Sequence, residues 1–202
     1  MRRARRAGLA IGVFAVALLA IPHLGLGGQR AAIAPPTINA GQEKRLLSVD
    51  TGSGPAALYT APATNGLECV TISVPDSAVA STGDAAFGNG GGECHPSSEL
   101  SQRLSGAQLT TSMSWVPLTG ATMALVIDGR AGSAIERVEL HLGDGTVVPA
   151  ALSDTFAGYY VSRITAPAIG KLPGDVAVVA YGAGGQELAQ VRLQDVLAAA
   201  TP

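Results

Sequence analysis

The feature that most constrains the fold is a strict alternation of apolar and polar residues in the C-terminal half of the chain. In residues 137–142 every second residue is a valine or a leucine, and the residues between them are arginine, glutamate and histidine. This period of two places the apolar side chains on one face of an extended strand. Gly143-Asp144-Gly145 then supplies turn-forming residues, and a second β-favouring run follows at 146–148. The segment therefore predicts a β-hairpin with one buried face.

Short β-favouring runs recur along the rest of the chain, separated by turns. The chain contains 26 glycines and 12 prolines, which favours frequent turns between short elements. We predict strands at residues 45–49, 57–60, 67–74, 108–116, 122–127, 138–142, 146–148, 156–164, 176–181 and 188–193. Beyond the N-terminal 28 residues, the segment after Pro96 suits a helix, and only a short one. Because no helix separates the strands of residues 118–195, two antiparallel sheets packed face to face are predicted there.

The N-terminus has the pattern of an export signal. Four arginines among residues 2–6 precede an uncharged apolar run that starts at Gly8. A run ending at Ile21 is about 21 Å long as a helix, whereas one ending at Gly28 reaches about 31 Å, close to the roughly 30 Å of a bilayer core. Residues 1–28 are therefore a signal anchor or a cleaved signal peptide, and the anchor is favoured. The anchor gives a single-pass cell-membrane protein with its C-terminal part extracytoplasmic, and cleavage gives a secreted one.

The remainder of the chain is acidic. Residues 1–28 contain four arginines and no acid, so residues 29–202 keep nine basic and fifteen acidic residues, a net charge of -6. Nucleic acid is therefore not an expected partner. Residues 29–44 contain Pro35-Pro36 and no sustained hydrophobic period, which predicts an extended tether. Residues 196–202 are interpreted as a tail.

The two cysteines, Cys69 and Cys94, are predicted to form a disulfide, because an exported chain meets an oxidising compartment. The closed loop of about 26 residues would stabilise the fold by roughly 3–4 kcal/mol. Residues 45–117 are assigned to a small disulfide-bearing β module, with a boundary near 117–120. This module includes a glycine-rich loop at 75–98, for which capture of a small ligand is one possible role.

Two stretches of the C-terminal part resemble the hairpins of a bacterial Ig-like module. They are Val138-Glu139-Leu140-His141-Leu142-Gly143-Asp144-Gly145-Thr146 and Val178-Val179-Ala180-Tyr181-Gly182-Ala183-Gly184-Gly185-Gln186-Glu187-Leu188. The whole chain is similar to exported, membrane-anchored proteins of GC-rich bacteria in which a disulfide-bearing segment precedes such a module. The resemblance implies a mainly β protein that ends in an Ig-like β-sandwich over 118–195. Because the matching residues form turns, it implies no functional residue.

One motif has a counterpart in catalysis. Asp50-Thr51-Gly52-Ser53 resembles the motif of aspartyl peptidases, in which two carboxylates share a proton and activate water. One copy supplies one carboxylate, so only a homodimer with Asp50 as the catalytic residue fits. A turn at the end of a strand is the favoured interpretation, because aspartate, glycine and serine are turn formers. The homodimeric aspartyl peptidase stays as the alternative function.

No other set of residues predicts catalysis, and neither a metal nor a cofactor is expected. His95 is interpreted as a loop residue and His141 as a solvent-facing strand residue, without the pattern of a catalytic triad. Trp115, Tyr159 and Tyr160 are candidate contacts for a partner. The two tyrosines are consecutive in a strand and must point to opposite faces, so one of them is expected to be exposed.

Together these patterns predict a non-enzymatic interaction or binding module of the bacterial cell envelope. It would be attached to the membrane through its N-terminal segment and would contact another envelope protein. The homodimeric peptidase and small-ligand capture are the alternatives that the sequence leaves open.

Overall fold

The computed structural model describes residues 39, 41–74, 80–81, 92–100, 102–118, 122–154 and 157–199. The signal segment predicted at 1–28, most of the tether and most of the glycine-rich loop lie outside the described residues. Within the described part of the chain, no helix is long and apolar enough to cross a membrane.

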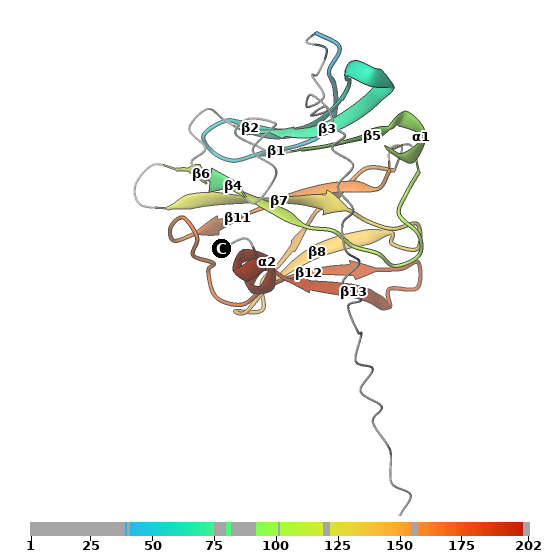
Figure 1. The fold of residues 1–202 in the computed structure, drawn as a ribbon. Coiled ribbons are helices and arrows are strands. Elements are labelled where there is room, and N and C mark those ends of the chain that lie inside the picture. The colour runs from blue at the N-terminus through green and yellow to red at the C-terminus, as the bar shows by residue number, and fades with distance from the viewer. Residues whose placement is uncertain are drawn as a thin grey trace, which may run out of the picture. The chain divides into compact units, whose positions relative to one another are not determined.

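The described strands form three antiparallel sheets, which lie as three layers (Figure 1). The first sheet has the order β1-β2-β3-β5, made of β1 (Lys44–Asp50), β2 (Pro55–Pro62), β3 (Leu67–Ser73) and β5 (Gly92–Pro96). The middle sheet has the order β10-β11-β7-β6-β4, made of β10 (Ala151–Leu152), β11 (Tyr159–Ala166), β7 (Met123–Arg130), β6 (Ser112–Pro117) and β4 (Ala80–Ser81). The third sheet has the order β13-β12-β8-β9, made of β13 (Glu187–Arg192), β12 (Val176–Tyr181), β8 (Arg137–Leu142) and β9 (Val147–Pro149).

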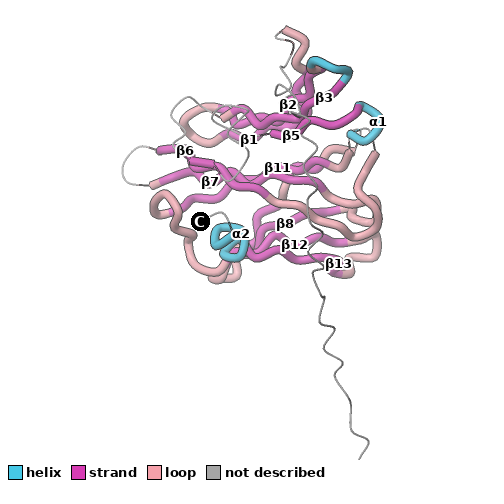
Figure 2. Tube along the Cα trace, viewed as in Figure 1, coloured by secondary structure: helices cyan, strands magenta, loops and turns pink. Residues whose placement is uncertain are grey.

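Helical structure is confined to short segments of the described residues (Figure 2). A 3-10 turn, η1 (Thr64–Gly66), connects β2 to β3. The helix α1 (Ser97–Leu100) follows β5, as predicted for the segment after Pro96, and α2 (Leu193–Ala199) follows β13. The helix α2 covers most of the segment that the sequence suggested was a tail. The fold is therefore mainly β, as predicted.

The middle sheet contributes to two hydrophobic cores, one on each of its faces. In β7, Leu125 and Ile127 belong to the core shared with the third sheet, whereas Ala124 and Val126 belong to the core shared with the first sheet. This division follows from the alternation of side chains along a strand. Because both faces of the middle sheet are covered, its strands are apolar on both sides.

Both hairpins on which the C-terminal prediction depended are confirmed. The strand β8 pairs with β9 across the turn at 143–146, and β12 pairs with β13 across the turn at 182–186. Val138 and Leu140 of β8 are fully buried, whereas His141 is partly exposed. The period of two in this segment thus reflects one buried face.

The boundary expected at residues 117–120 lies between two strands that pair with each other. β6 and β7 are antiparallel neighbours in the middle sheet, with Pro117 opposite Met123. Strand β4, from the preceding segment, pairs with β6 in the same sheet. The residues on either side of 117–120 therefore share one sheet.

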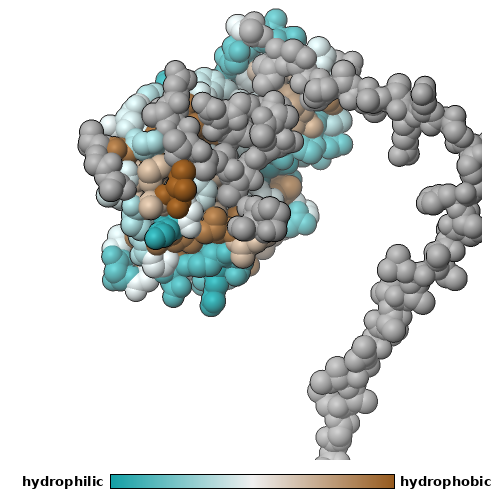
Figure 3. Space-filling view, turned by 60° about the vertical axis from the view of Figure 1, so that its left-hand side comes forward, coloured by the Kyte–Doolittle hydropathy of each residue, from teal (hydrophilic) through white to brown (hydrophobic). Residues whose placement is uncertain are grey.

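The surface of the described residues carries few large apolar side chains. Val147 and Ile169 are the exposed ones among them, at 48% and 46%. In the view of Figure 3, hydrophilic residues prevail at the lower end of the face, and hydrophobic ones form small groups above them. Because few large apolar side chains are exposed among the described residues, a ligand site is expected in a cavity.

Candidate functional site

The disulfide predicted from the sequence is present, and it fixes the edge strand β5. Cys69 of β3 and Cys94 of β5 lie directly opposite each other and are bonded. Val70 and Glu93 form the next opposed pair in this ladder. Since Val70 belongs to the core between the first and middle sheets, Glu93 points into the same space. The cross-link therefore holds a carboxylate between two layers of the protein.

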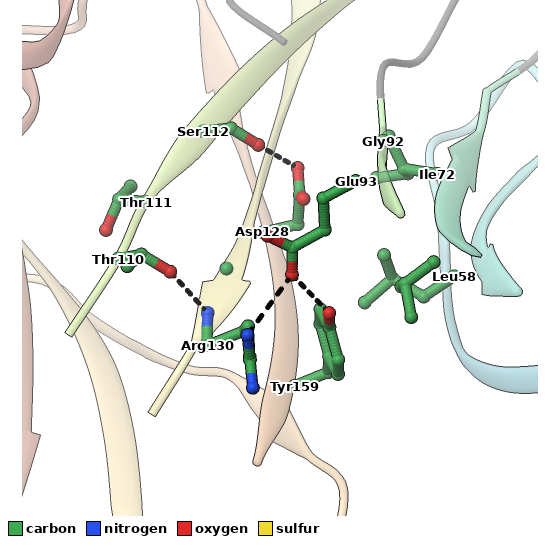
Figure 4. A pocket seen from close by; sticks show the side chains of 12 residues that line it. Leu58, Ile72, Gly92, Glu93, Thr110, Thr111, Ser112, Asp128, Arg130 and Tyr159 are labelled. Carbon is green, nitrogen blue, oxygen red and sulfur yellow. Dashed lines mark hydrogen bonds and ion pairs between the residues drawn. The ribbon is translucent and has the colours of Figure 1, made fainter. Parts of the chain in front are cut away.

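A cavity of about 210 Å³ opens where Glu93 meets the middle sheet (Figure 4). One wall is apolar and comes from the first sheet, through Leu58, Val70 and Ile72. The opposite wall is polar and comes from the middle sheet and the chain that leads into it; it comprises Thr110, Thr111, Ser112, Asp128, Gly129, Arg130 and Tyr159. An apolar cavity with a few convergent polar groups is typical of a small-molecule site. At roughly 30 Å³ for each water-sized group, it has room for about seven.

Asp128 is the acidic residue of the polar wall. It follows Val126 on the face of β7 that meets the first sheet, and it lies opposite Ser112 of β6. The Ser112 hydroxyl donates to Asp128 Oδ1 at 2.8 Å. Burial raises the pKa of Asp128 to about 6; the Ser112 hydrogen bond opposes this shift, and the charge of Glu93 adds to it. The side chain keeps some accessible surface, so it is enclosed by protein without being sealed from the cavity.

Glu93 is held by a second group of residues at the same cavity. The Tyr159 hydroxyl donates to Glu93 Oε1, and Arg130 Nη1 lies 3.6 Å from the same oxygen. The Arg130 guanidinium also lies over the Tyr159 ring, 5.4 Å from its centroid. These contacts follow from the register, because Tyr159 of β11 lies opposite Arg130 of β7. Burial and, next, the hydrogen bond to Glu93 raise the pKa of Tyr159, so its hydroxyl stays protonated.

The backbone beneath the polar wall is tightly packed. The backbone N–H of Arg130 donates to Thr110 Oγ1 at 3.0 Å, and Arg130 Nη2 donates to the carbonyl of Gln102 at 3.0 Å. At Gly129 an added Cβ would lie 2.0 Å from the Thr110 carbonyl oxygen. Only glycine allows this approach between the chain leading to β6 and the end of β7. The positions of Asp128 and Arg130 are therefore set by a rigid part of the sheet.

The expectation that Tyr159 or Tyr160 is exposed is wrong. Tyr159 is 3% exposed and Tyr160 0%, because β11 lies in the middle sheet and both of its faces are covered. Trp115, the third candidate partner contact, is 2% exposed and belongs to the core against the third sheet. The Tyr160 hydroxyl bonds to Thr111 Oγ1 and to the Thr110 carbonyl. Of the three aromatic candidates, only Tyr159 reaches the cavity.

Asp50 lies away from the cavity, in the turn between β1 and β2. Its carboxylate accepts a hydrogen bond from the backbone N–H of Gly52 at 2.9 Å, and the Thr51 hydroxyl donates to the Gly54 carbonyl at 2.7 Å. Asp50 itself is exposed and pairs with Pro55 at the end of the hairpin. The interpretation of this motif as a turn is confirmed.

The two histidines of the described residues lie outside the cavity walls. His95 is in strand β5 rather than in a loop, with Nε2 at 3.3 Å from Glu93 Oε2. Its position results from the pairing of β5 with β3, which extends the first sheet as far as Pro96. His141 lies on the outer side of the third sheet, as expected, near Glu139 and Tyr181.

Sequence reasoning did not select Asp128, Glu93 or Arg130 as site residues. Asp128 carries the one usable signal, because it directly follows the apolar run 123–127 within the same strand. A carboxylate at such a position must be paired or must face a cavity. The contribution of Glu93 depends on contacts with residues far away in the sequence, so no local pattern reveals it.

Among the described residues, no group of three or more histidine, cysteine, aspartate or glutamate side chains is arranged to hold a metal ion. The lining of the cavity instead offers two carboxylates, from Asp128 and Glu93, one guanidinium and several hydroxyls. Such a set can bind a charged organic group by hydrogen bonds and ion pairing. Comparison with protein-family models, with curated proteins and with solved structures gave no match, so the functional argument depends on the residues of this cavity.

Proposed function

We propose that this protein is a non-enzymatic binding protein of the bacterial cell envelope, and that the cavity between β5, β6, β7 and β11 is its ligand site. The observation that carries the proposal is the composition of the cavity: an apolar wall from one sheet faces a hydrogen-bonded polar wall from another. The groups of the polar wall are held in place by β ladders and by a disulfide. A site built from rigid elements in this way suits recognition of a defined small molecule.

We further propose that residues 112–192 are an Ig-like sandwich. The order β6-β7-β11-β10 corresponds to strands A-B-E-D of that architecture, and β9-β8-β12-β13 corresponds to C′-C-F-G. The first sheet then covers the outer face of the A-B-E-D sheet. In this interpretation the ligand site lies between the sandwich and the disulfide-bearing sheet that covers it.

The location of the protein follows from the sequence pattern. The arginines and the apolar run of residues 1–28 support export and attachment to the cell membrane, and the disulfide is consistent with an oxidising compartment. The proposal therefore has a single N-terminal membrane anchor, a tether and an extracytoplasmic β protein. Cleavage after the signal would instead release the same binding protein.

The test of the ligand site is a screen of small molecules by methyl NMR on the full-length protein in detergent micelles. Methyl signals of Leu58, Val70 and Ile72 report on occupancy, because these side chains form the apolar wall. We expect at least one class of compound to shift them in the wild type. The variant Val70→Phe, which places a larger side chain in the cavity, should lose the response.

If no compound class shifts the three signals, or if Val70→Phe responds as the wild type does, the cavity is not a ligand site. The melting temperature of the variant serves as the control for its folding. A response confined to methyl groups of the third sheet would also contradict the proposal, because it would place binding elsewhere.

The homodimeric aspartyl peptidase is the alternative, and it has an independent test. It requires two Asp50 carboxylates to share a proton across a dimer axis, so Asp50→Asn should abolish hydrolysis of a peptide library. Hydrolysis that depends on Asp50 would replace the binding proposal. A monomer without such activity would remove the alternative.

A further inference from the structure

Among the described residues, the lining of the cavity holds one more acid than bases. Glu93 and Asp128 are the acids of its lining, and Arg130 is the base. Arg130 is engaged by Glu93 Oε1 and by the Tyr159 ring, so its positive charge is directed at Glu93. Above the pH at which both acids are ionised, the lining carries one excess negative charge.

The excess charge belongs to Asp128. Its Oδ1 accepts the Ser112 hydroxyl, and in the described part of the chain no group hydrogen-bonds to Oδ2. Both oxygens of Glu93, in contrast, have partners: Tyr159 and Arg130 at Oε1, and the His95 ring at Oε2. Asp128 thus lines the cavity with an oxygen that no described residue hydrogen-bonds, and a ligand can supply a donor to it.

We propose that the cavity binds a small organic cation, a protonated primary amine on a short apolar chain, with Asp128 as its counter-ion. This inference rests on the proposed function, because it names the ligand class of the same site. The ammonium group donates to Asp128 Oδ2, and Ser112 Oγ offers a second acceptor beside it. The alkyl chain lies against the apolar wall formed by Leu58, Val70 and Ile72.

The chemistry of the lining argues against other ligand classes. An anion would face the excess negative charge, and Arg130, the cation among the described lining residues, already has Nη1 at 3.6 Å from Glu93 Oε1. A divalent metal prefers six or more oxygen ligands, whereas one carboxylate oxygen is unused. The volume of about 210 Å³ is below the roughly 300–1,000 Å³ that is usual for drug-sized ligands, which favours a small one. A short alkylammonium ion carries the charge opposite to that of Asp128, donates hydrogen bonds to it and fits the volume of the cavity.

The test uses three probes of equal chain length on the full-length protein, followed through the methyl signals of the apolar wall. The probes are n-butylammonium chloride, 1-butanol and sodium butyrate, and calcium chloride is added as a fourth. We expect n-butylammonium to bind at least tenfold more tightly than 1-butanol at pH 7.5. Asp128→Asn should remove that preference, and the exposed-site variant Asp50→Asn should retain it.

The pH dependence gives an independent readout. The charged or titratable groups that face Asp128 are Glu93, Arg130 and Tyr159. Because the pKa of Asp128 is about 6, protonation removes the counter-ion as the pH falls. We expect the affinity for n-butylammonium to fall by about tenfold between pH 7 and pH 5 in the wild type, and to stay constant in Asp128→Asn.

Different results would overturn the ligand class and the ligand site. Tighter binding of 1-butanol, butyrate or calcium in this cavity would overturn the cation inference and leave the ligand site intact. An ammonium preference that persists in Asp128→Asn would also overturn it, because another group would then be the counter-ion. Absence of any shift in the apolar wall with every probe and every screened compound would overturn the proposed function itself.

Discussion

Replacing Asp128 by asparagine tests the energetics of the cavity directly, because the structure assigns this carboxylate a pKa of about 6 against 3.8 for an unperturbed aspartate. The folded state holds the proton more tightly than the unfolded chain, so the free energy of unfolding falls as the pH rises through this interval. At about 1.4 kcal/mol for each pKa unit, full ionisation costs the folded protein up to about 3 kcal/mol. The stabilising contribution is complete below about pH 4 and is lost above about pH 6.

The asparagine introduced by Asp128→Asn is neutral at every pH, and its side-chain oxygen can still accept the Ser112 hydroxyl. The variant should therefore match the wild type at pH 4 and exceed it by about 2–3 kcal/mol at pH 7.5. The assay is urea unfolding of both proteins from pH 4 to pH 7.5 with the disulfide intact. The other residues of the cavity are the same in both proteins, so the difference between the two curves reports on Asp128.

Asp50→Asn is the matched control, because it removes the same charge from an exposed turn. It should change the free energy of unfolding by less than about 0.5 kcal/mol at either pH. A difference between wild type and Asp128→Asn that stays constant from pH 4 to pH 7.5 would refute the reasoning. A variant less stable than the wild type at pH 7.5 would show that ionised Asp128 is compensated by the fold.

Two further predictions concern the frame of the cavity. Replacing both Cys69 and Cys94 by alanine should lower the free energy of unfolding by roughly 3–4 kcal/mol, as read from the urea midpoint, because the cross-link spans a sequence separation of 25 residues; an unchanged midpoint would contradict this. Gly129→Ala should destabilise by about 3 kcal/mol or more, since its Cβ would lie 2.0 Å from a backbone oxygen. Gly143→Ala is the control, because its Cβ meets nothing closer than 3.4 Å. Equal melting temperatures for the two glycine variants would contradict the packing argument.

Most of the longer strands were predictable because their signals are local, whereas β5 lies in a stretch that the sequence assigned to a glycine-rich loop. The alternation in residues 137–142 and the glycine-rich turn after them specify a hairpin without reference to the rest of the chain. The cysteine pair was predictable for a different reason, since only two cysteines are present in a chain whose N-terminus has the pattern of an export signal. In both cases the information lies in residue type and spacing.

The arrangement of the layers was not predictable in the same way. Consecutive strand residues such as Tyr159 and Tyr160 point to opposite faces of the sheet, but the sequence does not show which elements cover those faces. The first sheet covers Tyr159 and the third sheet covers Tyr160. That outcome depends on contacts between segments far apart in the sequence, and the same contacts bring Glu93 to Asp128.

The aspartate at position 128 links the stability of the fold to ligand binding. An ionised Asp128 weakens the fold at neutral pH, and a bound cation would offset that loss by pairing with the unused oxygen. Ligand and folding are then coupled, so a saturating alkylammonium ion should raise the melting temperature of the wild type more at pH 7.5 than at pH 5. Asp128→Asn, already free of the ionisation cost, should gain little from the ligand at either pH. This pattern distinguishes a carboxylate that binds a ligand from one that stabilises the fold. If Asp128 stabilised the fold, Asp128→Asn would be less stable than the wild type. The shift in melting temperature caused by alkylammonium would then not depend on pH.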